Sequence, residues 1–286
     1  LIFQELEFQA LQNQLRSFKG EAPSIEKKSK KDYKSLTKIK EINTFINSIK
    51  EGAWLAFDLE TTSVEAMNCD IVGFSFSTRK DTGIYIPIHY KEKTSELFDD
   101  HLNNVIDIIK PIMENEKIPK TGQNIKFDGL ILKRHGINVK GIKFDTMIAA
   151  HLLKPELRNL KLETLSAEKL NYRMVPIEDL IGTGREQISM ADVELSKITF
   201  YASEDSDIAL QLTQIFIDEL KKQDLYTFFS TIEMPLLSVL LDMEFTGMYI
   251  DAKKLSKMSS DFGKKIEQLK NKIIKEAGTE FNINST

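Results

Sequence analysis

The sequence predicts an α/β fold in which helices pack on a central sheet. Three short β-rich runs follow one another, WLAFDLE (54–60), IVGFSFST (71–78) and GIYIPI (83–88), with turn-like segments between them. This succession is typical of adjacent antiparallel strands. Helical spacing of apolar residues then dominates as far as about residue 225, so we expect helices to cover the sheet.

The segment before the first β-rich run is expected to contain a helix and a linker. Residues 1–18 place apolar side chains roughly on one helical face. Residues 20–34, GEAPSIEKKSKKDYK, combine Gly20 and Pro23 with a run of lysines, which is typical of a solvated linker. Phosphate binding is the alternative role for these lysines.

The middle of the chain alternates helices with a short strand. Residues 102–113 have helical spacing, residues 120–123 read as a strand, and residues 125–135 read as another helix. Asn124 is suited to cap that helix, because its side-chain oxygen can accept a free amide of the first turn. Several helices follow, and the last and longest is expected at about residues 195–225.

The pattern changes from Thr231 onward. Residues 235–245, PLLSVLLDMEF, predict an amphipathic helix, and 247–251, GMYID, a turn with a short extended piece. The lysine-rich residues 255–278 predict a long helix. The chain starts with Leu1 and ends in the polar FNINST, so we expect a piece of a longer protein.

Composition limits the functional classes. The net charge of −4 argues weakly against a dedicated nucleic-acid-binding domain, although bound cations can supply positive charge to an acidic site. The single cysteine, Cys69, excludes an internal disulfide and a cysteine-based zinc site, and is expected to pack near a turn. We find no signal peptide and no apolar stretch that could span a bilayer, so we expect a reducing, cytoplasmic setting without membrane contact.

Two acids follow the apolar run of the first strand. Residues two apart on a strand share a face, so Asp58 and Glu60 project together, while Phe57 and Leu59 line the opposite face. Carboxylates in this position repel each other and resist desolvation, and a hard divalent cation such as Mg²⁺ relieves both costs. For this pair alone, a solvated and inert strand end is the alternative.

Three later residues support a metal site. Asp128 falls in the first turns of the helix after the short strand, and Tyr201 and Asp205 lie four apart on one face of the last helix. Asp207 falls on a different face, so we choose Asp205 as the inward acid. Taken singly, Asp128 could be an acid favoured near a helix start, and Tyr201 could be core packing.

Together these motifs resemble a known family. D-x-E (58–60), N-x-x-x-D (124–128) and Y-x-x-x-D (201–205) are similar to the three motifs of the DEDDy 3′–5′ exonucleases. Four further stretches are similar to the bacterial family A DNA polymerases (the DNA polymerase I family), so the resemblance covers nearly the whole chain. These stretches are LIFQELEFQAL (1–11), FDTM (144–147), TIEMPLLSVLLDMEFTGMYID (231–251) and EAGTEFNINST (276–286).

The resemblance implies a domain division and a fold. Residues 1–32 would be the helix and lysine-rich linker from a 5′-nuclease junction, 33–226 the proofreading exonuclease, and 227–286 the truncated start of the polymerase thumb. It implies a ribonuclease H-like fold, a mixed sheet with flanking helices. It also implies a monomer in the bacterial cytoplasm, associated with the nucleoid, whose parent protein is a DNA-directed DNA polymerase in replication and repair.

The resemblance also implies a mechanism with two divalent ions, Mg²⁺ with Mn²⁺ or Zn²⁺ as alternatives. Asp58, Glu60 and Asp205 would hold one ion, and Asp58 and Asp128 the other. Tyr201 would orient the attacking water together with Glu60. The substrate would be a single-stranded or frayed DNA 3′ end, and the product a nucleoside 5′-monophosphate.

Four residues are candidates for holding the substrate. Val64 matches an apolar position that packs on the terminal base, and is smaller than the leucine we would expect. Ile177 aligns roughly with a phenylalanine of the family pattern, which would weaken base stacking. Thr61 and Asn124 are further candidates for substrate contact, and helix capping is the alternative role for Asn124.

Three other functions remain open. A relative that kept this domain only as a spacer would lack the acids, and all four are present. A ribonuclease D-like 3′-exoribonuclease shares the motifs, although the polymerase-like C-terminal run argues against it. A non-enzymatic DNA-binding module would bind without metal and would not cleave.

Overall fold

A mixed six-stranded sheet forms the centre of the fold. The structure is a computed structural model, and it describes residues 31–89 and 98–285. The order across the sheet is β1-β4-β3-β2-β5-β6. The predicted runs are β2, β3 and β4, paired antiparallel as expected, while β1, β5 and β6 add in parallel. The strands are β1 (Asp32–Ser35), β2 (Leu55–Thr61), β3 (Ile71–Ser77), β4 (Thr82–Pro87), β5 (Lys120–Gly122) and β6 (Ile142–Asp145).

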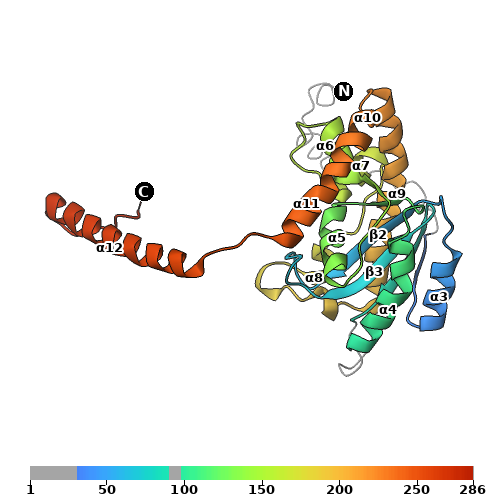
Figure 1. Cartoon of the computed structure of the whole chain (residues 1–286), viewed down its shortest axis with the longest axis horizontal. Helices are drawn as coiled ribbons and strands as arrows, with labels where there is room; N and C mark the ends of the chain where they lie inside the picture. Colours follow the sequence, from blue (N-terminus) through green and yellow to red (C-terminus); the bar gives the residue numbers. More distant parts are fainter. Residues whose placement is uncertain (1–30, 90–97, 286) are drawn as a thin grey trace, which may run out of the picture. The chain divides into compact units, whose positions relative to one another are not determined.

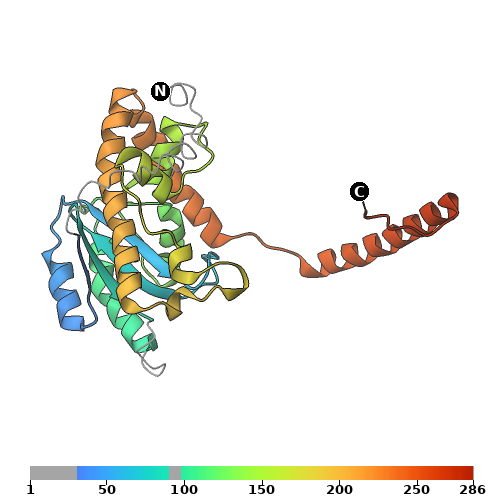
Figure 2. The same ribbon diagram turned by 180° about the vertical axis from the view of Figure 1, so that it is seen from behind.

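Helices cover both faces of the sheet (Figures 1 and 2). Helix α9 crosses one face, and α3 and α4 lie on the other. The helices predicted at 102–113, 125–135 and 195–225 are confirmed as α4, α5 and α9. The α-helices are α3 (Ile39–Ser48), α4 (Phe98–Met113), α5 (Ile125–Arg134), α6 (Thr146–Leu153), α7 (Leu162–Lys169), α8 (Glu178–Ile181), α9 (Leu195–Lys222), α10 (Tyr226–Phe228), α11 (Met234–Thr246) and α12 (Ala252–Ala277). Short turns of 3₁₀ helix lie at η2 (Gly184–Glu186) and η3 (Met190–Asp192), and η4 (Phe229–Glu233) is a π-helical turn.

Strand β2 occupies an interior position, which explains its apolar character on both faces. Phe57 and Leu59 pair across the ladder with Phe76 and Phe74 of β3, and all four are buried. Phe45 of α3 contacts the ring of Phe76, with 6.3 Å between centroids. This apolar layer fixes one face of β2, so its alternate residues must point toward α9.

Helix α9 lies close against the opposite face of the sheet. A Cβ built on Gly83 of β4 would stand 2.6 Å from the Cβ of Ser203, so only glycine lets the helix approach this far. Further along, the hydroxyl groups of Thr213 on α9 and Thr121 on β5 share a buried hydrogen bond of 2.6 Å. The helix that carries the predicted Y-x-x-x-D motif is therefore fixed to the sheet at two separate strands.

The structure corrects the predicted linker at its C-terminal end. Residues 32–35 form edge strand β1, paired in parallel with β4, instead of a solvated segment. The side chain of Lys31 is only 9% exposed and is ion-paired to Asp81 and Asp207. The distant partners of this strand, at β4 and α9, explain why local composition could not reveal it. The predicted helix at 1–18 and the first part of the linker lie outside the described residues.

The predicted C-terminal helices are confirmed as α11 and α12, and contacts divide them between two compact units. The first unit extends to Phe245, and α11 packs on α5, where a Cβ on Gly129 would stand 2.6 Å from Cδ1 of Leu241. The second unit, Thr246–Thr286, contains α12, whose apolar residues are exposed. The division at residues 226 and 227 remains a prediction. Within the part of the chain that the structure describes, no helix is both long and apolar enough to cross a membrane.

Candidate active site

The first two acids stand where β2 ends. Asp58 and Glu60 occupy alternate positions opposite Ser75 and Gly73 of β3, so both project toward α9 as their spacing predicts. The register shifts between Glu60 and Thr61, and such bulges re-aim side chains near functional sites. Glu60 is 6% exposed, and among the described residues its Oε1 atom has no hydrogen-bond partner.

Helix α9 brings Asp205 to this pair. One carboxylate oxygen from each of Asp58, Glu60 and Asp205 lies within 4.8 Å of the others. The choice of Asp205 over Asp207 as the inward acid agrees with this geometry. Three carboxylates at this separation form a set of hard oxygen ligands, which suits Mg²⁺ or Mn²⁺.

Asp128 lies beside the three carboxylates, in the first turn of α5. It is 2% exposed and accepts a backbone hydrogen bond from Leu59, and the charges of Asp58 and Glu60 act on it. Asp128 is not one of the three residues whose carboxylate oxygens lie within 4.8 Å of one another. Its position next to Asp58 suits a second ion held between the two carboxylates.

Burial governs the protonation of the cluster. Burial raises the pKa of Asp58 to about 7. Burial and the charge of Asp58 raise the pKa values of Glu60, Asp128 and Asp205 further above their usual range. Within residues 31–89 and 98–285 no lysine or arginine forms an ion pair with these four acids. Buried acids without cationic partners are costly, so this site favours a cation from outside the chain.

Tyr201 lies on the same side of α9 as Asp205. Burial and the charge of Asp205 raise the pKa of its phenol, with smaller effects of Glu60 and Asp58. The phenol therefore stays protonated at neutral pH, which is consistent with positioning rather than with proton removal. Its ring packs against the buried cluster that contains Val72 and Tyr85.

Asn124 does not cap α5 through its side chain as predicted. It has a left-handed backbone (φ 56°), and no capping hydrogen bond of its side chain is found in the described residues. Asp145 caps α5 instead, because its carboxylate accepts hydrogen bonds from the backbone N–H groups of Asn124 (3.4 Å) and Ile125 (2.8 Å). The same carboxylate accepts Met147 N–H at 2.8 Å and so caps α6 as well.

Sequence reasoning missed Asp145. An acid between a strand and a helix is an N-cap signal, and Asp145 in FDTM shows it for α6. The bond to α5 depends on the distant pairing of β5 with β6, which the local sequence does not display.

The substrate-binding candidates fall into two places. Val64 and Asn124 line one open groove of about 460 Å³ together with Phe127, and Val64 is 91% exposed. Ile177 instead packs, like Tyr201, against the buried cluster that contains Val72 and Tyr85. Thr61 donates its hydroxyl to the carbonyl of Ser63 at 2.8 Å, so it shapes the loop after β2.

Comparisons with known proteins agree with this geometry. A family model described as 3′–5′ exonuclease matches residues 33–221. The chain is 35% identical to DNA polymerase I of Chloroflexus aurantiacus over 84% of its own length and 25% of that protein. It is 35% identical to DNA polymerase I of Borreliella burgdorferi over 88% of its length and 27% of that protein. Our chain thus spans about a quarter of the length of these relatives.

A solved structure shows the same fold. The POL domain of Pol1 from M. smegmatis, in complex with a DNA primer-template and dNTP, aligns with a TM-score of 0.66 and 18% identity. The alignment covers 88% of this chain and 39% of that one.

Proposed function

The chain belongs to the 3′–5′ exonuclease family of the A-type DNA polymerases, and from this premise we propose that it hydrolyses the terminal phosphodiester of a DNA 3′ end. The product is a nucleoside 5′-monophosphate. The observation that carries the proposal is the group of three carboxylates, Asp58, Glu60 and Asp205, within 4.8 Å of one another.

The residues at the site fit two divalent metal ions. Glu60 Oε1 is a buried oxygen without a partner in the described chain, and the raised pKa values of the acids express the cost of their burial and of their mutual charge. Asp58, Glu60 and Asp205 would hold one ion, and Asp58 and Asp128 the other. When bound, Mg²⁺ or Mn²⁺ supplies an acidified water and charge stabilisation for the leaving oxygen.

The chain's own groups orient the reactants. Tyr201 keeps its proton, so its hydroxyl can donate a hydrogen bond to the attacking water or to the phosphate oxygen beside it. Glu60 lies within the same cluster and can accept the other hydrogen bond of that water. Holding water and phosphate in line contributes to the rate by removing their rotational freedom.

The groove lined by Val64 and Asn124 is the proposed place of the terminal nucleotide. Asn124 supports this role, since its side chain is not used as a helix cap in the described structure. Thr61 would hold the loop that carries Val64, and Ile177 would contact the strand near Tyr201. The last nucleotide must be single-stranded or frayed to reach the acids.

DNA synthesis would belong to the longer parent protein and not to this chain alone. The relatives named DNA polymerase I are about four times longer than the matched region, so DNA synthesis is a proposal for the parent protein. We expect no template-directed nucleotide addition from these 286 residues alone. A monomer in the bacterial cytoplasm, working at the nucleoid, fits the proposal.

The test is digestion of 5′-labelled single-stranded and 3′-recessed DNA with Mg²⁺ or Mn²⁺. We expect stepwise shortening from the 3′ end that disappears in Asp58→Ala and in Asp205→Ala. Activity that survives both substitutions would contradict the proposal. RNA of the same sequence distinguishes the exoribonuclease alternative, and metal-independent binding without cleavage would indicate a DNA-binding module.

A further inference from the structure

A buried acid lies two residues beyond Asp205 on α9. Asp207 is fully buried, and its carboxylate accepts four hydrogen bonds. The donors are Tyr33 Oη at 2.6 Å, Lys31 Nζ at 2.8 Å, the backbone N–H of Asp81 at 2.9 Å and Gln211 Nε2 at 2.9 Å. The exonuclease motifs assign no role to this residue.

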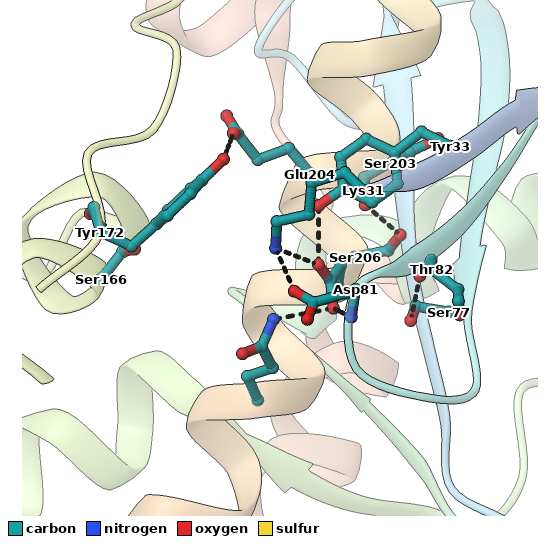
Figure 3. A network of polar contacts seen from close by, with 12 residues as sticks. Lys31, Tyr33, Ser77, Asp81, Thr82, Ser166, Tyr172, Ser203, Glu204 and Ser206 are labelled. Carbon is teal, nitrogen blue, oxygen red and sulfur yellow. Dashed lines mark hydrogen bonds and ion pairs between the residues drawn. The ribbon is translucent and has the colours of Figure 1, made fainter. Parts of the chain in front are cut away.

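The donors come from separate parts of the fold (Figure 3). Lys31 and Tyr33 belong to the segment at β1, and Asp81 to the turn before β4. Gln211 lies one helical turn beyond Asp207 on α9. Asp81 has a left-handed backbone (φ 63°), which places its N–H toward Asp207. Asp207 therefore ties the helix to the β1–β4 edge of the sheet.

Lys31 strengthens this connection. Its ammonium group lies 2.8 Å from both Asp207 and Asp81 and 4.8 Å from the ring centroid of Tyr172. Burial alone would lower the pKa of Lys31, but the hydrogen bonds and charges of Asp207 and Asp81 raise it overall. The ammonium group of Lys31 is thus held in its charged form, and charge-assisted hydrogen bonds of this kind attach α9 firmly.

The neighbour on the other side of Asp205 is anchored as well. Glu204 is fully buried, and its carboxylate accepts Tyr172 Oη at 2.5 Å and the backbone N–H of Val175 at 2.8 Å. Each residue advances an α-helix by about 100°, so Asp205 and Asp207 lie on nearly opposite sides of α9. A rotation of the helix that releases Asp207 must therefore move Asp205 as well.

We propose that Asp207 is a positioning residue for the metal site. Its bonds to β1 and to the β3–β4 turn hold α9 at the rotation and height where Asp205 reaches Asp58 and Glu60. The proposal rests on the proposed function, because it concerns the same acids. A shift of about 1 Å in a positioned group can reduce a rate ~100-fold, so a small movement of α9 is enough to matter.

The test compares Asp207→Asn with a matched variant on the same helix. Glu219 forms a partly buried ion pair with Lys169 at 2.8 Å, near the far end of α9, and Glu219→Gln removes its charge in the same isosteric way. The measurement is the unfolding temperature of the 286-residue chain against Mn²⁺ concentration, without DNA. The parent chain should be stabilised by Mn²⁺, and Asp58→Ala should lose this stabilisation.

We expect Asp207→Asn to raise the Mn²⁺ concentration at half-stabilisation about tenfold, the lower end for groups that orient metal ligands. Glu219→Gln should leave it within about twofold, even if both variants unfold at lower temperature. In the digestion assay, kcat should fall in Asp207→Asn while KM for DNA stays close to the parent value. Tyr33→Phe removes a single hydrogen bond to Asp207 and should raise the Mn²⁺ midpoint about threefold.

An unchanged Mn²⁺ midpoint in folded Asp207→Asn would overturn the proposal and leave Asp207 a purely structural residue. If Asp207→Asn does not fold, Tyr33→Phe decides between the two outcomes in the same way. A parent chain that shows no Mn²⁺-dependent stabilisation would instead contradict the proposed metal site, which is a different failure.

Discussion

Asp205 and Asp207 of helix α9 differ in what surrounds them. Asp207 accepts hydrogen bonds from Lys31, Tyr33 and Asp81, and its charge is balanced within the chain. Asp205, two residues earlier, shares its surroundings with Asp58 and Glu60 and has no described basic partner. Buried charge is stable only when it is paired. The difference supports the two proposals, that Asp207 holds α9 in place and that Asp205 receives a cation.

The largest expected effect tests the unpaired acid. Asp205→Asn should reduce exonuclease activity at least ~1,000-fold, as expected for the loss of a residue that acts at the reacting atoms. In a chelator it should not lower the free energy of unfolding, because it relieves repulsion among the carboxylates. Digestion of 5′-labelled DNA and urea unfolding measure the two effects. If Asp205→Asn lowered the free energy of unfolding in a chelator, the contrast between Asp205 and Asp207 would be contradicted.

The paired acid should behave in the opposite way. Asp207→Ala leaves the ammonium group of Lys31 buried with one ion pair fewer, and should cost about 3–5 kcal/mol of unfolding free energy. Urea unfolding with and without Mn²⁺ measures it, and Glu219→Ala is the control for loss of a less buried ion pair. If Asp207→Ala lost less unfolding free energy than Glu219→Ala, the proposed role of Asp207 in holding α9 would be contradicted.

The pH dependence of stability should sharpen the same contrast. Because the folded-state pKa of Asp58 is about 7, above the usual ~3.9, the folded chain binds this proton more tightly than the unfolded chain. The resulting stabilisation is complete below pH ~4 and is lost as the pH rises through 7. In a chelator, the unfolding temperature of Asp58→Asn should therefore fall less steeply over this range than that of the parent chain. Parallel curves for the two chains would contradict the raised pKa.

The smallest expected effect concerns the substrate groove. Val64→Leu adds a methylene group worth about 0.8 kcal/mol if the terminal base covers it, so KM for single-stranded DNA should fall about fourfold. The side chain is 91% exposed, so stability should not change. Val239→Leu makes the same change at an exposed position of α11 and should leave KM unaltered. Equal effects of the two substitutions would exclude a specific role for Val64.

Local periodicity explains which parts of the site could be predicted. The two-residue period of β2 places Asp58 and Glu60 together, and the four-residue spacing on α9 places Tyr201 beside Asp205. These relations depend only on neighbours in the sequence, and the carboxylate group confirms the shared direction of the three acids. The consecutive strands β2, β3 and β4 were predictable for the same reason.

Contacts between distant segments explain what the sequence did not show. Lys31 and Tyr33 meet Asp207 across more than 170 positions, so the lysine-rich stretch looked solvated when taken alone. Asn124 resembled a helix cap, but Asp145, 21 residues later, satisfies the backbone there instead. Both errors arise because a polar residue's partner cannot be inferred from its own surroundings in the sequence.

Strand β1 also determines which strand forms the edge of the sheet. It covers the edge of β4, whose backbone groups would otherwise be open to pairing with another chain. A shortened chain that began at Ile39 would keep all four acids and Tyr201, yet it would expose this edge next to the anchorage of α9. Four residues with no place in the exonuclease motifs thus pair the backbone of β4 and move the edge of the sheet away from it.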